Sequence, residues 1–173
     1  MNQCGHYDDS ALPDGVRSRF VEDVNGLTFH ILEAGDAHLN RPALILLHGF
    51  PELAYSWRRV MPALAEQGYY VIAPDQRGYG RTTGWSDDYY ADLAPYRLLN
   101  LVRDILSLLR AVGRDHVDAV IGHDFGASVA AYAALIRPDV FRAMILMSAP
   151  FAGPPTLGPA PLDTIHTEMK ALD

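Results

Sequence analysis

The chain has 173 residues, 49% of them hydrophobic, which is enough to build one domain with a buried core. Its formal net charge is −7 at pH 7 and its basic residues form no run, so nucleic acid and anionic membrane surfaces are excluded as partners. The single cysteine, Cys4, allows no internal disulfide or thiolate metal site, and without a signal pattern or an apolar run longer than Val129–Ile136 we expect a soluble, cytoplasmic protein.

The first predicted elements form an antiparallel hairpin. Two extended runs, Arg17–Val24 and Leu27–Ala34, are joined at Asn25-Gly26. This dipeptide favours a tight primed turn because both of its residues tolerate positive φ. The chain therefore enters its sheet through an antiparallel edge.

After the hairpin, strand-like and helix-like segments alternate. The predicted strands are apolar runs, as expected in a sheet that is covered on both faces: Ala43–Leu47, Tyr69–Ala73, Val117–Ile121 and Arg142–Ser148. A helix is predicted over Leu98–Val112, where apolar residues recur at helical spacing and Gly113 follows as a stop. A second helix, rich in small residues, is predicted over Gly126–Arg137. The alternation indicates an α/β fold, with a mostly parallel sheet and helices on both of its faces.

The composition changes after Ser148. Residues Gly153–Pro161 are too rich in proline for a helix or a central strand, and Asp163–Asp173 has the pattern of the first turns of a new helix. We therefore divide the chain into residues 1–150, the N-terminal part of a core domain, and residues 151–173, a linker and the start of a further segment.

The predicted chemistry concentrates in Gly122-His123-Asp124-Phe125-Gly126, between a predicted strand and a predicted helix. A nucleophile elbow requires this strand–turn–helix setting and this glycine spacing, which holds the central residue above the sheet. The central residue is Asp124, where the better-known elbow has serine. A carboxylate can displace a leaving group from saturated carbon and become an ester, so Asp124 predicts alkyl rather than acyl chemistry. The alternative is that Asp124 caps the following helix.

A second motif, His48-Gly49-Phe50-Pro51, directly follows the predicted strand Ala43–Leu47. In a fold with a nucleophile elbow, the loop at this place supplies a backbone N–H to the oxyanion hole. We predict the N–H groups of Phe50 and Phe125 as the two donors, which would stabilise the negative oxygen when water attacks the ester. Because proline alone makes a cis peptide cheap, and this loop must turn sharply, we expect Phe50-Pro51 to be cis.

Other polar and aromatic residues near these motifs are given structural roles. The glycine-rich loop Asp75–Thr82 is predicted to shape the rim of the site, and His48 and His123 are predicted to brace loops. Tyr89 and Tyr90 are expected to pack over the long helix. No group of histidine, cysteine and acidic residues has metal-ligand spacing, and no phosphate-binding glycine loop is present, so no metal and no cofactor is predicted.

Five motifs occur together over about Val16–Pro155. They are His48-Gly49-Phe50-Pro51-Glu52, Tyr55-Ser56-Trp57-Arg58, Asp75-Gln76-Arg77-Gly78-Tyr79-Gly80, Gly122-His123-Asp124-Phe125-Gly126 and Ser148-Ala149-Pro150-Phe151. This set resembles the epoxide hydrolases of the α/β-hydrolase fold. The resemblance implies that Asp124 opens a small apolar epoxide to an alkyl-enzyme ester, and that a later histidine–acid pair activates water to release the diol. It also implies a cap domain, beginning in residues 151–173, whose tyrosines hold the epoxide oxygen.

Two other families of the fold also use an elbow aspartate. Haloalkane dehalogenases usually place tryptophan after the nucleophile, since an indole N–H is a fitting halide donor. Fluoroacetate dehalogenases usually place arginine there, to hold the substrate carboxylate. Phe125 offers neither group, and an apolar ring beside the nucleophile suits a neutral epoxide.

The acid and the histidine that follow the nucleophile in this fold have no clear counterpart in the chain. His166 is the only histidine after Asp124, and it lies beyond the proline-rich segment rather than after a last strand. Asp139 and Asp163 also follow no later strand. We therefore expect a chain that is truncated before the cap and the last strands, with an incomplete catalytic set and a tendency to self-associate through the strand Arg142–Ser148. The alternative from another class is a catalytically inactive remnant that binds an apolar ligand.

Overall fold

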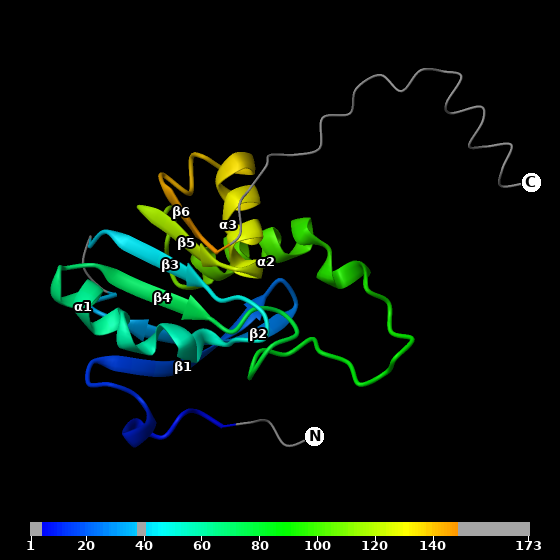
Figure 1. The fold of residues 1–173 in the computed structure, drawn as a ribbon, viewed down its shortest axis with the longest axis horizontal. Helices are drawn as coiled ribbons and strands as arrows, with labels where there is room; N and C mark the ends of the chain where they lie inside the picture. Colours follow the sequence, from blue (N-terminus) through cyan, green and yellow to red (C-terminus); the bar gives the residue numbers. More distant parts are fainter. Residues whose placement is uncertain (1–4, 38–40, 149–173) are drawn as a thin grey trace, which may run out of the picture.

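The computed structural model describes residues 5–37 and 41–148. They contain a six-stranded sheet in the order β1-β2-β4-β3-β5-β6 (Figure 1). The strands are β1 (Val16–Val24), β2 (Leu27–Ala34), β3 (Ala43–Leu47), β4 (Tyr70–Pro74), β5 (Ala119–His123) and β6 (Met144–Met147). The helices are α1 (Met61–Glu66), α2 (Leu98–Ala111) and α3 (Phe125–Ile136), with short 3₁₀ helices η1 (Asp9–Ala11), η2 (Ala54–Arg59) and η3 (Ala94–Tyr96).

The predicted hairpin is confirmed. Strands β1 and β2 pair antiparallel, and both Asn25 (φ 51°) and Gly26 (φ 78°) adopt the positive φ that a primed turn requires. The pairing shifts register between Val21 and Val24, and Asp23 there also has a positive φ of 57°. Strand β2 then pairs antiparallel with β4, and so joins the hairpin to the rest of the sheet.

The remaining strands are parallel, as predicted. Strand β3 lies between β4 and β5, and β6 pairs with β5 on the outer side of the described sheet. The predicted bounds of β3 are met at both ends, whereas β4 and β5 begin one and two residues later than predicted. Val117, predicted to start β5, makes an isolated bridge to Phe141 instead. The carboxyl ends of β3, β4 and β5 come together at one edge of the sheet, and this edge carries the motifs.

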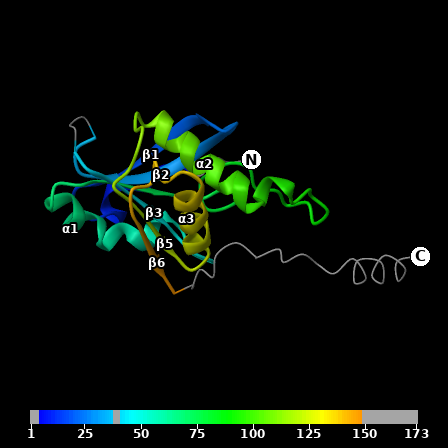
Figure 2. The same cartoon turned by 90° about the horizontal axis from the view of Figure 1, so that it is seen from above.

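Helices cover both faces of the sheet, as predicted (Figure 2). On one face, Ile45, Leu47 and Ile72 are buried in a cluster that includes the apolar side chains of α2 and α3. On the other face, Leu44 and Leu46 are buried with Trp57 of η2 and Met61 of α1. Because neighbouring residues of β3 point to opposite faces, a strand between two such layers must be apolar throughout.

Two features of the chain between β3 and α2 differ from the sequence prediction. Helices η2 and α1 were not predicted, because each is only six residues long, although Pro62 in the first turn of α1 and Gly68 after its end are ordinary start and stop signals. The expectation that Tyr89 and Tyr90 pack over α2 is wrong: their exposed fractions are 92% and 89%, and the two rings contact each other in a segment that extends away from the sheet (Figure 1). Aspartates next to them favour a solvated loop at this place.

Strand β6 ends the described sheet with apolar residues that remain exposed. Met144, Ile145 and Met147 have exposed fractions of 48%, 50% and 39%. The predicted linker Gly153–Pro161, and the residues Asp163 and His166, lie outside the described residues, as do the last three residues of the motif that begins at Ser148.

Candidate active site

Asp124 lies at the turn between the end of β5 and the first residue of α3. Its backbone has φ 51° and ψ −120°, a combination that side-chain-bearing residues rarely adopt. Its own N–H donates to the carbonyl oxygen of Met147 at the end of β6 (2.9 Å), and its carbonyl accepts the N–H of Ala127 in α3 (2.9 Å). The strained turn is therefore fixed by a hydrogen bond on each side.

Three glycines make this turn possible because a side chain would collide at each of them. A Cβ on Gly126 would collide with the carbonyl oxygens of Leu47 and His48, and a Cβ on Gly122 would collide with the backbone of α3. A Cβ on Gly49 would lie 2.5 Å from the Cβ of Asp124. The close approach of the elbow to the loop after β3 therefore depends on all three glycines.

The carboxylate of Asp124 points to the loop after β3. The N–H of Phe50 donates to Oδ1 of Asp124 over 2.9 Å. This N–H stabilises the charged form of Asp124 and is the largest cause that holds its pKa below the ordinary value. The N–H of Phe125 is the second cause. The Asp124 side chain makes no N-cap hydrogen bond, which would come from an N–H one or two residues beyond Phe125, so the alternative role as a helix cap is not supported. The structure thus brings together the three residues that the motifs singled out.

The loop after β3 is held by His48, whose side chain is fully buried. Nε2 of His48 accepts the N–H of Gln76 (3.0 Å), so in the neutral ring the proton is on Nδ1, which faces the carbonyl of Gly49 (2.9 Å). Gln76 in turn donates its side-chain amide to the carbonyl of His48 (2.7 Å). Burial lowers the pKa of His48 and favours this neutral form. The peptide bond Phe50-Pro51 is cis, as predicted.

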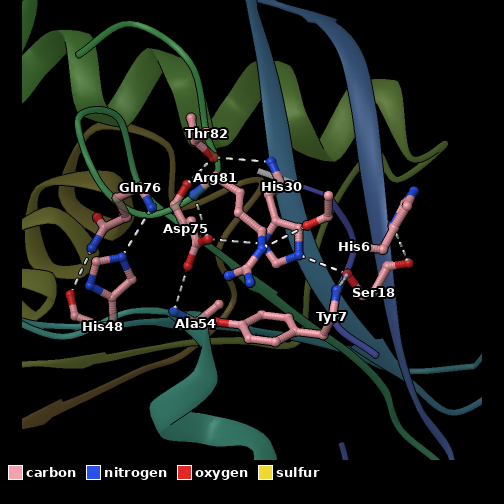
Figure 3. A network of polar contacts seen from close by, with 11 residues as sticks. His6, Tyr7, Ser18, His30, His48, Ala54, Asp75, Gln76, Arg81 and Thr82 are labelled. Atoms are coloured by element: carbon pink, nitrogen blue, oxygen red, sulfur yellow. Dashed lines mark hydrogen bonds and ion pairs between the residues drawn. The ribbon is translucent and has the colours of Figure 1, made fainter. Parts of the chain in front are cut away.

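Asp75 fixes the next loop from a fully buried position (Figure 3). Its carboxylate accepts hydrogen bonds from Nδ1 of His30 (2.8 Å), the N–H of Ala54 (2.9 Å) and the N–H of Arg81 (3.1 Å). Burial acts to raise the pKa of Asp75, but the bond from His30 and the two N–H groups outweigh burial, and the pKa lies below its ordinary value. The predicted structural role of the loop Asp75–Thr82 therefore has a concrete form: one carboxylate ties it to η2 and to β2.

The side chains of His123 and Glu52 are paired beside Asp124. Nδ1 of His123 lies 3.2 Å from Oε2 of Glu52, and the two side chains are 30% and 38% exposed. His123 also contributes to the lowered pKa of Asp124, after the two N–H groups. Glu52 was not predicted as a site residue, although it directly follows the His48-Gly49-Phe50-Pro51 motif. Its position after that motif is the signal that could have identified it.

The two residues whose N–H groups act on Asp124 carry apolar rings that are partly exposed. Phe50 is 68% exposed and Phe125 is 39% exposed. Tyr79, from the loop after β4, packs edge-on against His48 with 5.0 Å between ring centroids. Burial, and then the charge of Asp124, raise the pKa of the Tyr79 hydroxyl. Tyr79 belongs to the motif that begins at Asp75, but no role of its own was predicted for it.

Asp139 does not reach this site. It follows α3 at the end opposite to Asp124, and its carboxylate accepts a hydrogen bond from Nε of Arg137 (2.7 Å). In the ranges 5–37 and 41–148, no group of three or more histidine, cysteine and acidic side chains is placed to hold a metal ion. Among the same residues, no helix is both long enough and apolar enough to cross a membrane.

Comparison with known proteins agrees with this architecture. The family model described as alpha/beta hydrolase fold matches residues 42–166. An epoxide hydrolase of Caballeronia sordidicola is 42% identical over 142 residues, which are 82% of this chain and 40% of that protein. Epoxide hydrolase A of Mycobacterium tuberculosis (strain ATCC 25618 / H37Rv) is 40% identical over 136 residues, 79% of this chain and 40% of that protein.

A solved structure gives the same result. The crystal structure of epoxide hydrolase VrEH1 from Vigna radiata matches with a TM-score of 0.72 and 36% identity, over 90% of this chain and 46% of that one. The chain thus spans about two fifths of the length of the curated relatives it matches. The resemblance to epoxide hydrolases that the motifs indicated is confirmed, and the chain belongs to the α/β-hydrolase fold family.

Proposed function

We propose that this chain carries the nucleophile of an epoxide hydrolase, and that Asp124 attacks an epoxide carbon to form an ester. The observation that carries the proposal is the carboxylate of Asp124, held at a strained turn and bonded through Oδ1 to the N–H of Phe50. The names of the similar proteins support the same substrate class. A carboxylate suits this reaction because it can attack saturated carbon.

The two oxygens of Asp124 have different roles in this proposal. Oδ1 accepts the N–H of Phe50, so Oδ2 is the oxygen that forms the bond to carbon while the ring C–O bond breaks. Oδ1 then becomes the carbonyl oxygen of the ester, and it takes the negative charge when water attacks the ester carbon. The N–H groups of Phe50 and Phe125 are therefore the proposed oxyanion donors, and the N–H of Phe50 already donates to Oδ1 before the first step.

The apolar surroundings favour an epoxide over a haloalkane or a carboxylated substrate. Phe125, directly after the nucleophile, is 39% exposed and carries no donor for a halide and no cation for a carboxylate. A neutral apolar epoxide would contact Phe50 and Phe125 without leaving a charge unpaired.

The second step needs a base, and the family resemblance implies for it a histidine later in the sequence than Asp124. Of the two described histidines near Asp124, His48 has its Nε2 occupied by the N–H of Gln76 inside the core, and His123 comes before Asp124, with its Nδ1 paired with Glu52. General base catalysis typically contributes about 10² to 10⁴ in rate. We therefore propose that the 173-residue chain stops at the ester, and that the acid, the base and the cap tyrosines implied by the family resemblance are needed for turnover.

The proposed reaction class can be tested with two electrophiles. The chain is incubated with styrene oxide and, separately, with 1-chlorohexane, and intact-protein mass is followed over time. An epoxide adds its whole mass and releases nothing, whereas a haloalkane adds only its alkyl group and releases halide. We expect an adduct from the epoxide that is absent in Asp124→Asn. An adduct from the haloalkane with halide release, and none from the epoxide, would contradict the proposed class.

A further inference from the structure

The segment before β1 contacts two of the loops around the site through a stack of side chains. The guanidinium of Arg81 lies 3.6 Å from the centroid of the Tyr7 ring, and Tyr7 stacks on Tyr55 with 5.1 Å between centroids and 21° between planes. The guanidinium of Arg58 lies 3.8 Å from the centroid of the Tyr55 ring. We call these four residues the aromatic stack. A cation on an aromatic face and two offset rings are both attractive arrangements.

Backbone contacts hold the segment in this position. Nε of Arg81 donates to the carbonyl of Gly5 (2.9 Å), and the hydroxyl of Tyr55 donates to the carbonyl of Ala11 (3.0 Å). The N–H of Tyr7 donates to Oγ of Ser18 on β1 (3.3 Å). The segment is therefore tied at both ends to the loops and in its middle to the sheet.

The aromatic stack connects the same two loops as the buried carboxylate of Asp75. Oδ1 of Asp75 accepts the N–H of Ala54, next to Tyr55, and Oδ2 accepts the N–H of Arg81 (Figure 3). Tyr55 belongs to η2, which directly continues the loop that contains Phe50. A shift of η2 would therefore move the N–H of Phe50 relative to Asp124.

We propose that Tyr7 is a positioning residue, which fixes η2 through Tyr55 and thereby holds the N–H of Phe50 against Oδ1 of Asp124. The importance of Tyr7 for catalysis rests on the proposed function. The effect of Tyr7 on the hydrogen bond between Phe50 and Asp124 is independent of that function. The N–H of Phe50 is the first cause of the lowered pKa of Asp124, so the titration of Asp124 reports how well the loop is held. A role in overall stability alone would leave this titration unchanged.

The experiment is a pH titration of the folded chain by NMR, following the side-chain carboxyl of Asp124 and the amide of Phe50. In Tyr7→Ala we expect the titration midpoint of Asp124 to move up and the Phe50 amide to lose its response to that titration. In Tyr7→Phe, which keeps the ring, both signals should stay as in the unchanged chain. Tyr89→Ala is the matched control, because Tyr89 is 92% exposed and lies outside the stack.

A milder substitution is included in case Tyr7→Ala does not fold. Tyr7→Leu keeps an apolar cover over Tyr55 but removes the flat ring and its cation contact. An unchanged midpoint in Tyr7→Leu would overturn the proposal, whatever the behaviour of Tyr7→Ala. An equal shift in Tyr89→Ala would overturn it as well, because the effect would then not depend on the stack.

The rate of ester formation with styrene oxide separates this inference from the proposed function. If both hold, Tyr7→Leu should slow the formation of the adduct by about three- to tenfold, since misplacement of a reacting group is costly. If the unchanged chain forms no adduct but the titration shifts as described, the positioning role stands and the proposed function fails. If the unchanged chain and Tyr7→Leu form the adduct at the same rate, and Asp124 titrates at the same midpoint in both, the positioning role fails and the proposed function stands.

Discussion

The N–H of Phe50 donates to Oδ1 of Asp124 over 2.9 Å, although 74 positions separate the two residues in the sequence. One residue follows a strand in the centre of the sheet, and the other follows the neighbouring parallel strand, so their loops meet at the same edge. The bond distinguishes the two carboxylate oxygens before any substrate is present. In the proposed mechanism, this bond leaves Oδ2 as the attacking atom and prepares Oδ1 to carry charge in the later step.

The elbow should tolerate no side chain at Gly126. Gly126→Ala places a Cβ against the carbonyl oxygens of Leu47 and His48, which are backbone atoms and cannot rotate away. We expect a loss of about 3 kcal/mol in the free energy of unfolding, together with loss of adduct formation. Denaturant unfolding and intact-protein mass spectrometry measure the two effects. Gly5→Ala is the matched control, because a Cβ there meets nothing within 4 Å, and its stability should stay within about 0.5 kcal/mol.

The strained backbone of Asp124 should lower the stability of the folded chain. Glycine adopts φ 51° with ψ −120° without steric penalty, so Asp124→Gly should raise the midpoint of thermal unfolding. Asp124→Ala loses the same carboxylate but keeps the strain, and its midpoint should lie below that of Asp124→Gly. Differential scanning calorimetry of the two variants decides the point. Equal midpoints would mean that the turn is not strained in solution.

Asp75 should control the acid stability of the chain. Its pKa lies below the ordinary value of 3.8, so its ionisation stabilises the folded state at neutral pH, and this contribution is lost as the pH falls below about 4. Asp75→Asn should lower the free energy of unfolding at pH 7 by about 3 kcal/mol, because His30 and two backbone N–H groups lose a charged acceptor. The difference from the unchanged chain should shrink towards pH 3. A difference that stays constant from pH 7 to pH 3 would contradict the assignment.

The apolar outer strand β6 should cause self-association. Met144, Ile145 and Met147 are exposed on the outermost strand of the described sheet, and the N–H and C=O groups along such an edge can pair with another chain. We expect an apparent mass in light scattering that rises with concentration, and a smaller rise in Ile145→Lys. Leu99→Lys is the control, because Leu99 is an exposed apolar residue on α2, away from the edge. If both lysine variants behave alike, association does not depend on β6.

Much of the fold could be predicted because its signals are local. The turn at Asn25-Gly26 needs only two residues that accept positive φ, and β3 is recognised from an apolar run buried on both faces. The elbow was predicted because the turn requires glycine at Gly122 and Gly126 for a steric reason that can be read directly from the spacing. The cis bond at Phe50-Pro51 was predicted because the loop after β3 must also turn sharply and proline makes a cis peptide cheap.

The parts that escaped prediction depend on long-range contacts. Glu52 is a site residue only because the fold brings it to His123, 71 positions away. The role of Tyr7 depends on Arg81 and Tyr55, neither of which is near it in the sequence. The position of Glu52 after the motif that ends at Pro51 could have drawn attention to this residue, but the sequence has no periodicity or spacing that reveals the partner in either pair. The exposure of Tyr89 was missed for a related reason, since an aromatic residue in a loop packs only if the loop folds back.

The most direct test of the central claim is the position of the ester after reaction with an epoxide. The unchanged chain and Asp124→Asn are incubated with styrene oxide, digested and mapped by peptide mass spectrometry, while diol is measured in the same samples. We predict an adduct of the epoxide's mass on Asp124, accumulating to at most one per chain, with no sustained diol production. An adduct on another residue that persists in Asp124→Asn, or many turnovers of diol by the 173-residue chain, would contradict the account.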